Sequence, residues 1–282
     1  MFDLRIVERS AEGLGEVAAF LRSAFPRGGH LSAEYLDWMY CQNPDGEAVA
    51  VNAYDGKELI GHVAFVCGRS RVLGRDESCV LGVNAATAPG KRRQGLFKAL
   101  FGRCCEIAVE QSYTLLLTTA NATSMLALET VGFQNLGLLD VRVGAGPTPR
   151  RRPVQDLELD RIWTRKALLW RLSRPGAVYR FRRRGDLARI YANSGIAGMR
   201  VDLGDFPAGD VGDAIPELEV WNTLRVWIGL DPGRRWGLHP YFNLPVRLRP
   251  SPLCLGVLDL TSAERRFHRE QVRVDGLDLD LY

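Results

Sequence analysis

The chain has 282 residues, of which 46% are hydrophobic and 25% charged, a composition typical of a globular protein with one large domain or two of ordinary size. It has no apolar run of about 18 residues, and its charged N-terminus lacks the apolar core of a secretory signal, so we expect no membrane span and a cytoplasmic location. The six cysteines follow no metal-ligand or disulfide spacing, so we predict reduced thiols and no bound metal.

Helical and strand patterns alternate along residues 1–145. Apolar residues at helical spacing predict two early helices, and the alternation around Asp55 and Gly56 predicts a β-hairpin. After the hairpin, the sequence predicts a strand, the loop APGKRRQGLFKAL, a helix, a buried strand, a further helix and a last strand. The expected helices cover residues 11–25, 32–43, 94–110 and 124–132, and the expected strands cover 48–68 (the hairpin), 78–87, 113–120 and 135–144.

The segment GAGPTPRRRPVQ, rich in Gly, Pro and Arg, predicts a boundary between two domains, 1–145 and 146–282. We expect the second domain to begin with a basic helical region up to about residue 192 and to continue with a strand-rich section. A faint echo of YLDWMYCQNPDG in TLRVWIGLDPG favours a degenerate copy of the first fold, although four matching positions also arise by chance.

Positive charge is concentrated at the start of the second part. The net charge is only +4, but residues 150–184 hold 11 arginines and one lysine against three acids. This stretch is either a solvated surface or a contact for an acidic partner, such as a diphosphate ligand or an anionic membrane surface. We expect no nucleic-acid partner, because no recognised nucleic-acid-binding motif accompanies the charge.

The loop APGKRRQGLFKAL, residues 88–100, combines cationic side chains with a glycine at the start of a helix. A helix N-terminus exposes unpaired backbone N–H groups and carries partial positive charge, so it attracts anions. The loop is therefore either a phosphate cradle or an ordinary basic helix start, and it matches neither the Walker nor the Rossmann pattern. The residues that would form the cradle are Arg92, Arg93, Gln94, Gly95, Leu96 and Phe97.

Two segments together carry a family resemblance. TAPGKRRQGLFKALF resembles motif A of the GNAT acyltransferases, V-x-P-x-x-R-G-x-G-x-G/A followed by an apolar helix, and NATSMLALETVGF resembles the family's N-x-x-A-x-x-x-Y-x-x-x-G-F segment. The matching positions are Pro89, Arg92 and Gly95 in the first segment and Asn121, Gly132 and Phe133 in the second. The resemblance covers residues 1–145 and implies an α/β (α+β) fold: a mixed, splayed sheet flanked by helices, here with a second, smaller α+β domain.

The resemblance also implies a cofactor and its contacts. The co-substrate would be acetyl-CoA or another short acyl-CoA, with its pyrophosphate on the backbone of residues 92–97. The pantetheine arm would pair, like a strand, with Ala85, Ala86 and Thr87, and Asn121 would contact the pantetheine end.

The sequence departs from the family pattern at the positions that carry chemistry. Phe97 stands where the third small residue of motif A is usual, and Leu128 stands where many members have a tyrosine that protonates the departing thiolate. The acidic residue that often begins the fourth strand has no counterpart in CVLGVN. The usual acid and base are therefore both missing by position.

Substitute catalytic groups are few in residues 1–145. His62 has a pKa range suited to a base, Asn84 can hold the acceptor or a water, and Tyr113 can supply a proton, although each also fits a structural role. Trp38 and Tyr40 are candidates to stack on an acceptor or, alternatively, core residues of a helix.

The acceptor is predicted from a second, weaker resemblance. YLDWMYCQNPDG and the late LRPSPLCLGVLDL look like a two-domain GNAT subgroup of bacterial surface-polysaccharide pathways, which implies a small-molecule primary amine on a nucleotide-linked amino sugar. The alternatives are a GNAT acting on protein lysines or antibiotic amines, against which the arginine-rich second half argues, and a non-catalytic acyl-CoA-binding protein, which the missing acid and base leave open.

Overall fold

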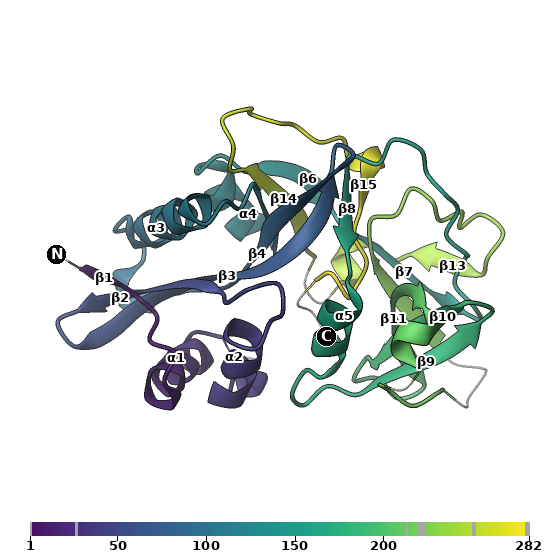
Figure 1. Ribbon diagram of the computed structural model, residues 1–282, viewed down its shortest axis with the longest axis horizontal. Helices are drawn as coiled ribbons and strands as arrows, with labels where there is room; N and C mark the ends of the chain where they lie inside the picture. The colour runs from purple at the N-terminus through teal and green to yellow at the C-terminus, as the bar shows by residue number, and fades with distance from the viewer. Residues whose placement is uncertain (1, 26–27, 213, 219–223, 250–251, 280–282) are drawn as a thin grey trace.

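The computed structural model describes residues 2–25, 28–212, 214–218, 224–249 and 252–279, which form two β-sheets with helices packed on them (Figure 1). The first sheet has the order β1-β2-β3-β4-β5-β14-β6, and β8 and β15 extend it from the far end of the long strand β3. Its strands are β1 (Asp3–Ile6), β2 (Val49–Asp55), β3 (Glu58–Val72), β4 (Arg75–Thr87), β5 (Leu115–Ala120), β6 (Gln134–Leu138), β8 (Leu159–Ile162), β14 (Cys254–Asp259) and β15 (Val272–Arg273).

Helices cover both faces of the first sheet. On one face, α1 (Ala11–Ala24) and α2 (Ala33–Tyr40) pack on β3 and begin at serine caps, Ser10 and Ser32, whose hydroxyls accept backbone N–H bonds. On the other face, α3 (Leu96–Glu110) and α4 (Ala122–Glu129) bury an apolar core with Val63 and Phe65. The capped helices and the hairpin β2–β3 agree with the sequence pattern.

The first sheet is splayed at its centre. Strands β4 and β5 pair in parallel only from Cys79–Leu115 to Gly82–Thr118, and no ladder joins them beyond that point. A β-bulge lies at the same place, because Ala64 pairs with Val83 whereas His62 pairs with Ala86. The predicted mixed, splayed sheet flanked by helices is therefore confirmed.

The second sheet, with the order β13-β7-β12-β11-β10-β9, repeats the strand pairing of the first. From β9 to β13 the ladders are antiparallel, antiparallel, parallel, antiparallel and antiparallel, as they are from β2 to β6. This repetition supports the hypothesis of a degenerate copy. The elements are β7 (Asp140–Ala145), α5 (Arg165–Leu172), β9 (Tyr179–Arg184), β10 (Leu187–Asn193), β11 (Met199–Pro207), α6 (Ala208–Val211), β12 (Leu224–Gly229) and β13 (Tyr241–Asn243).

The two sheets exchange strands. Strand β7 precedes residue 145 in the chain but pairs with β12 and β13 in the second sheet, and β14 lies between β5 and β6 in the first. The boundary at residue 145 stays a prediction, and this exchange means that neither half completes its sheet alone.

Three local expectations were wrong. The single strand expected at 135–144 is two strands, β6 and β7, which belong to different sheets. The basic region expected to be helical is helical only in α5, because the segment around β9 and β10 alternates apolar and polar residues with period two and forms a hairpin. The two segments of the sequence echo also differ, since one lies in α2 and the other in β12.

Among the described residues, the longest helix is α3 with 15 residues, and no helix is long and apolar enough to cross a membrane. All six cysteines are free, and four of them are buried.

Candidate active site

The loop between β4 and α3 exposes backbone N–H groups. Gly95 caps α3 in the left-handed conformation, with φ of +75°, and offers no side chain to bond the first turn. The first intrahelical bond runs from the Ala99 N–H to the Gly95 carbonyl. The N–H groups of Leu96, Phe97 and Lys98 therefore have no partner within the helix and are available to an anion.

The loop also carries uncompensated positive charge. Lys91 is paired with Asp55, with 2.6 Å between Nζ and the carboxylate. Arg92 and Arg93 are exposed, and within the described part of the chain neither has a carboxylate within ion-pair distance. Gln94 bonds back to the Gly90 carbonyl at 3.3 Å and closes the turn. These charges reinforce the N–H groups at the start of α3.

A large cleft of about 1300 Å³ opens over this loop. It is lined by the loop, the end of β4 and the first turns of α4, and the second half adds Val246, Pro252 and Cys254 to its wall. No aspartate or glutamate is found among the described residues that line it. The cleft therefore has the size and the charge for a large anionic ligand.

The end of β4 offers a free backbone edge to this cleft. On one side Ala86 and Thr87 pair with His62 and Gly61 of β3. On the other side no ladder to β5 continues past Gly82, so the backbone groups of Ala85 to Thr87 that face the cleft are open to an extended ligand.

A second cavity of about 380 Å³ lies where β4 and β5 separate, and it shares Ala85, Phe97 and Asn121 with the cleft. Four phenylalanines, Phe25, Phe65, Phe97 and Phe101, give it apolar walls. The Oδ1 atom of Asn121 accepts a bond from the Ser124 N–H at 2.9 Å and so caps α4. Leu128 lines the cavity and has no proton to donate, and Leu253 enters from the second half.

Asn84 lies in this cavity at the β4 bulge, with φ of +53°, a conformation that Asn tolerates better than most residues. Its Nδ2 atom donates to the Tyr40 hydroxyl at 2.9 Å. That hydroxyl lies 2.9 Å from His62 Nε2, and His62 Nδ1 lies 2.7 Å from the Oδ1 atom of Asn52. The four side chains form one buried chain of hydrogen bonds.

The direction of the bonds in this chain follows from its far end. Tyr54 donates to the Glu16 carboxylate at 2.6 Å, and its oxygen accepts from Asn52 Nδ2 at 3.2 Å. The Oδ1 atom of Asn52 must then accept, so His62 carries its proton on Nδ1 and its Nε2 accepts from Tyr40. Full burial lowers the pKa of His62 to about 3, so the ring is neutral near pH 7.

The structure thus brings Asn84, His62 and Tyr40 together, although the sequence placed them in separate roles. Tyr40 is 1% exposed and stacks on His62 with ring centroids 5.9 Å apart. Its direct stacking on an acceptor stays a prediction that this burial does not favour. No local sequence signal links Tyr40 to Asn84, because the contact depends on how α2 packs on the sheet.

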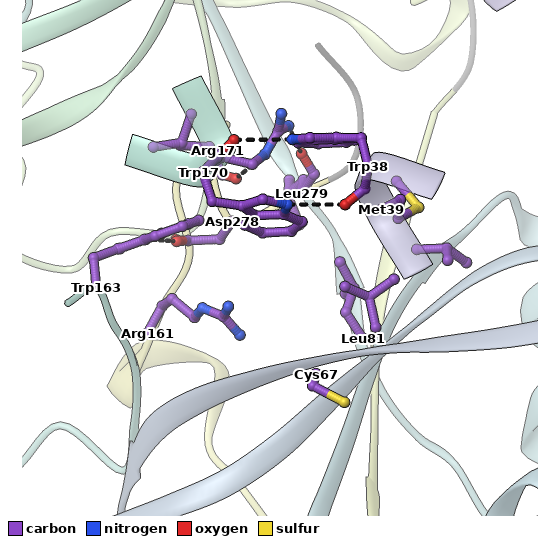
Figure 2. A pocket seen from close by; sticks show the side chains of 13 residues that line it. Trp38, Met39, Cys67, Leu81, Arg161, Trp163, Trp170, Arg171, Asp278 and Leu279 are labelled. Atoms are coloured by element: carbon purple, nitrogen blue, oxygen red, sulfur yellow. Dashed lines mark hydrogen bonds between the residues drawn. The ribbon is translucent and has the colours of Figure 1, made fainter. Parts of the chain in front are cut away.

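Trp38 lies at the contact between the two halves (Figure 2). Its ring stacks on Trp170 at 4.8 Å, and each indole N–H donates to the other residue's carbonyl, at 3.0 and 2.9 Å. The adjoining cavity of about 30 Å³ has room for only a few waters. In this arrangement Trp38 holds the halves together, and its predicted contact with an acceptor gains no support.

One wall of this small cavity is a buried carboxylate, Asp278, to which the Trp163 indole N–H donates at 2.7 Å. Burial raises the pKa of Asp278 to about 6, and the neighbouring Asp275 carboxylate adds to the shift.

Tyr113 lies away from the cavity at the splayed strands. Its hydroxyl donates to the Sγ atom of Cys67 at 2.9 Å, and burial raises its pKa. It precedes β5, five residues before Thr118, which corresponds to roughly 16 Å along an extended strand. This distance gives no support to Tyr113 as a proton donor at the splay.

No family model and no curated protein sequence matches the chain. Among solved structures, it is similar to a GCN5-related N-acetyltransferase from Anabaena variabilis, at 12% identity and a TM-score of 0.62, covering 93% of this chain and 74% of that one. It is also similar to Eis1 from Mycobacterium abscessus, at 12% identity and a TM-score of 0.55, covering 92% and 74%. A third is a protein of unknown function from Enterococcus faecalis described as a probable N-acyltransferase, at 12% identity and a TM-score of 0.53, covering 92% and 71%.

At this level of identity the likeness concerns the fold. It extends over both halves of the chain and so confirms the predicted GNAT-like architecture with a second α+β part. No group of three or more potential metal-ligating side chains occurs in the described part of the chain.

Proposed function

We propose that the protein is an acyl-CoA-dependent N-acyltransferase that moves an acetyl or short acyl group to a primary amine. The observation that carries the proposal is the continuity of two cavities: one lies over an anion-binding loop, the other lies between splayed strands, and both share Asn121 and Ala85. The similar structures, two of them described as N-acetyl- or N-acyltransferases, support it.

In this proposal, the CoA pyrophosphate binds the N–H groups of Leu96, Phe97 and Lys98, with Arg92 and Arg93 adding charge-assisted bonds. The pantetheine arm follows the open edge of β4, and the thioester enters the cavity beside Asn84. A short acyl group fits best, because the cavity of about 380 Å³ must also admit the acceptor amine.

The reaction forms a C–N bond and breaks the C–S bond of the thioester. The amine must lose a proton before it attacks, and the thiolate must gain one as it leaves. No Asp, Glu or His occurs among the described residues that line the inner cavity, so water carries both protons, and close positioning of amine and thioester supplies much of the rate. Asn84 orients the amine, and Tyr40 and His62 hold Asn84 in place.

For the acceptor, we propose an amine on a neutral or anionic scaffold, such as a nucleotide-linked amino sugar. The specific support is electrostatic: the described lining of both cavities has four cationic side chains and no acidic one, so a polycation would find no counter-charge. The resemblance of the late segments to polysaccharide-pathway GNATs points the same way.

Turnover of acetyl-CoA with a panel of amines tests the proposal. We expect acetylation of nucleoside-diphosphate amino sugars, with a KM that rises with salt, and little activity on polyamines, aminoglycosides or lysine peptides. Preferential acetylation of a cationic amine would exclude the sugar acceptor, and tight CoA binding without turnover of any amine would favour a non-catalytic role. Absence of CoA binding would refute the whole proposal.

A further inference from the structure

A third cavity, of about 480 Å³, lies on the second half of the chain and is built mainly from arginines. It is formed by residues 150–153, the end of β9, the first residues of β10, and one residue each of β11 and β15. Its six arginines are Arg150, Arg151, Arg152, Arg184, Arg189 and Arg273, and its one described carboxylate is Asp205. The acyl-transfer site uses none of these residues.

Carboxylates neutralise three of the six arginines. Arg189 forms a bidentate ion pair with Asp205, in which both N–O distances are 2.6 Å. Arg151 pairs with Asp231 at 2.8 Å and also with Asp275, and Arg273 pairs with Asp160.

The other three arginines have no such partner. Within the described residues, no carboxylate lies within ion-pair distance of Arg150, Arg152 or Arg184. The Arg184 side chain donates a long hydrogen bond, of 3.4 Å, to the Thr148 carbonyl. Partial burial and the charge of Arg189 lower the pKa of Arg184, so its positive charge is unfavourable as long as nothing compensates it.

The shape of the site argues for a small ligand. A volume of about 480 Å³ lies in the range of small-molecule pockets, and the site is concave rather than an open stripe of charge. Leu187, which is 45% exposed, and Pro153 add an apolar wall beside the guanidinium groups. A planar guanidinium group can donate two parallel hydrogen bonds to a phosphate, and three cationic side chains without a carboxylate partner around one cavity match an anion with more than one phosphate group.

We propose that this arginine cavity binds a small anion carrying two or more phosphate groups, of the inorganic polyphosphate or nucleoside polyphosphate class. The site is separate from the CoA loop and does not depend on acyl transfer. The proposal gives a role to Arg150, Arg152 and Arg184 of the arginine-rich stretch, which take no part in the candidate active site.

The test is a calorimetric titration of the full chain with inorganic triphosphate. The CoA loop is blocked in two independent ways, by saturating CoA in the wild type and by Arg92→Gln with Arg93→Gln in a second protein. We expect one triphosphate site per chain in both, which keeps the outcome independent of the proposed acyltransferase. Titration with ATP, which carries the same three phosphates on a nucleoside, then tells whether the nucleoside adds affinity.

Two variants locate the site. Arg184→Gln and Arg152→Gln should each weaken triphosphate binding by about tenfold or more, because each removes charge-assisted bonds. The matched control is Arg183→Gln, which changes the charge equally at an exposed neighbour of Arg184 outside the cavity and should alter the affinity by less than about twofold.

Arg152 is exposed, so its variant should fold and keeps the test valid if Arg184→Gln is unstable. Absence of triphosphate binding in both blocked proteins would overturn the inference. Equal losses in Arg183→Gln and Arg152→Gln would also overturn it, because they would indicate general attraction by a basic surface.

Discussion

Beside the inner cavity of the first sheet, buried polar side chains form a chain of neutral hydrogen-bonding groups, whereas one face of the second sheet buries ion pairs. The first chain runs from Asn84 through Tyr40 and His62 to Asn52 and ends at a cavity. In the second sheet, Arg189 and Asp202 are fully buried and belong to a network with several further carboxylates and guanidinium groups. Six strands of the first sheet and the six of the second pair with the same pattern of directions, so a main difference lies in what covers the two sheets.

On the first sheet, α3 covers the face opposite α1 and α2, and the loop of the proposed CoA site leads into it. On the second sheet, α5 packs on the face of Ala188 and Ile190, so the next side chain, Arg189, points to the opposite face. The helix described between β11 and β12 is the four-residue α6. On the Arg189 face, Arg189 and Arg234 donate instead to the carbonyls of Thr148 and Pro149 in the segment after β7. The first sheet therefore carries the loop of the proposed CoA site, and the second carries buried ion pairs and the arginine cavity.

The largest effect on stability is expected from removing Arg189, which pairs with Asp202 and Asp205 on the buried face of the second sheet. Arg189→Leu leaves Asp202 and Asp205 buried without their main counter-charge, so the free energy of unfolding should fall by about 3–5 kcal/mol. Denaturant unfolding measures it. Arg183→Leu, at an exposed site on β9, is the control and should change it by less than about 0.5 kcal/mol. A small loss in Arg189→Leu would mean that the ion pairs do not hold this face.

The next effect concerns the loop at α3. Gly95→Val puts a β-branched side chain at a φ of +75° and into the space that the proposed CoA site assigns to the pyrophosphate, so CoA affinity should fall by roughly a hundredfold. Calorimetry with CoA measures this. Gly102→Val, also free of neighbours within 4 Å but in the middle of α3 and outside the cleft, is the matched control. Unchanged affinity in a folded Gly95→Val protein would remove the CoA assignment.

Tyr40→Phe tests whether the hydrogen-bond chain that includes Tyr40 and His62 positions Asn84. The change removes the acceptor for the Asn84 amide, so kcat should fall by about tenfold while the Kd of CoA stays the same. Tyr113→Phe is the control, because that hydroxyl bonds Cys67 outside the cavity. Should Tyr113→Phe lower kcat and Tyr40→Phe leave it unchanged, Tyr113 would be the proton donor and the positioning role of Tyr40 would be wrong.

The smallest expected effect is on the pH dependence of stability, because His62 of the neutral hydrogen-bond chain and the buried carboxylates of the second sheet titrate in different pH ranges. His62 has a folded pKa of about 3, below its ordinary value near 6.5, so the stability it contributes is present above pH 6.5 and is lost as the pH falls. The loss should reach about 1.4 kcal/mol by pH 5.5. The lowered carboxyl pKa values of Asp205 and Asp275 act at lower pH, since their contributions are lost only as the pH falls below their ordinary range near 4.

The measurement is the free energy of unfolding of wild type and His62→Gln at pH 7.0 and 5.5. We expect the wild type to lose more than the variant does. A parallel decrease in both proteins would show that other groups cause the acid sensitivity.

Much of the first half was predictable from the sequence because its signals are local. The serine caps of α1 and α2, the hairpin at Asp55 and the loop before α3 each depend on residues within a few positions of one another. Asn121 and Leu128 were singled out differently, by the resemblance of one continuous segment to the GNAT pattern, and both line the inner cavity.

The tertiary structure alone decided which distant residues meet. Tyr40 and Asn84 are 44 positions apart, and Trp38 and Trp170 are 132 positions apart, yet both pairs are hydrogen-bonded. The exchange of β7 and β14, and the pairing of arginines with aspartates in the second half, depend likewise on strand register and packing. A run of arginines has the same local pattern whether it faces water, pairs with buried carboxylates or lines a cavity, because its charge is balanced by residues that only the fold brings near.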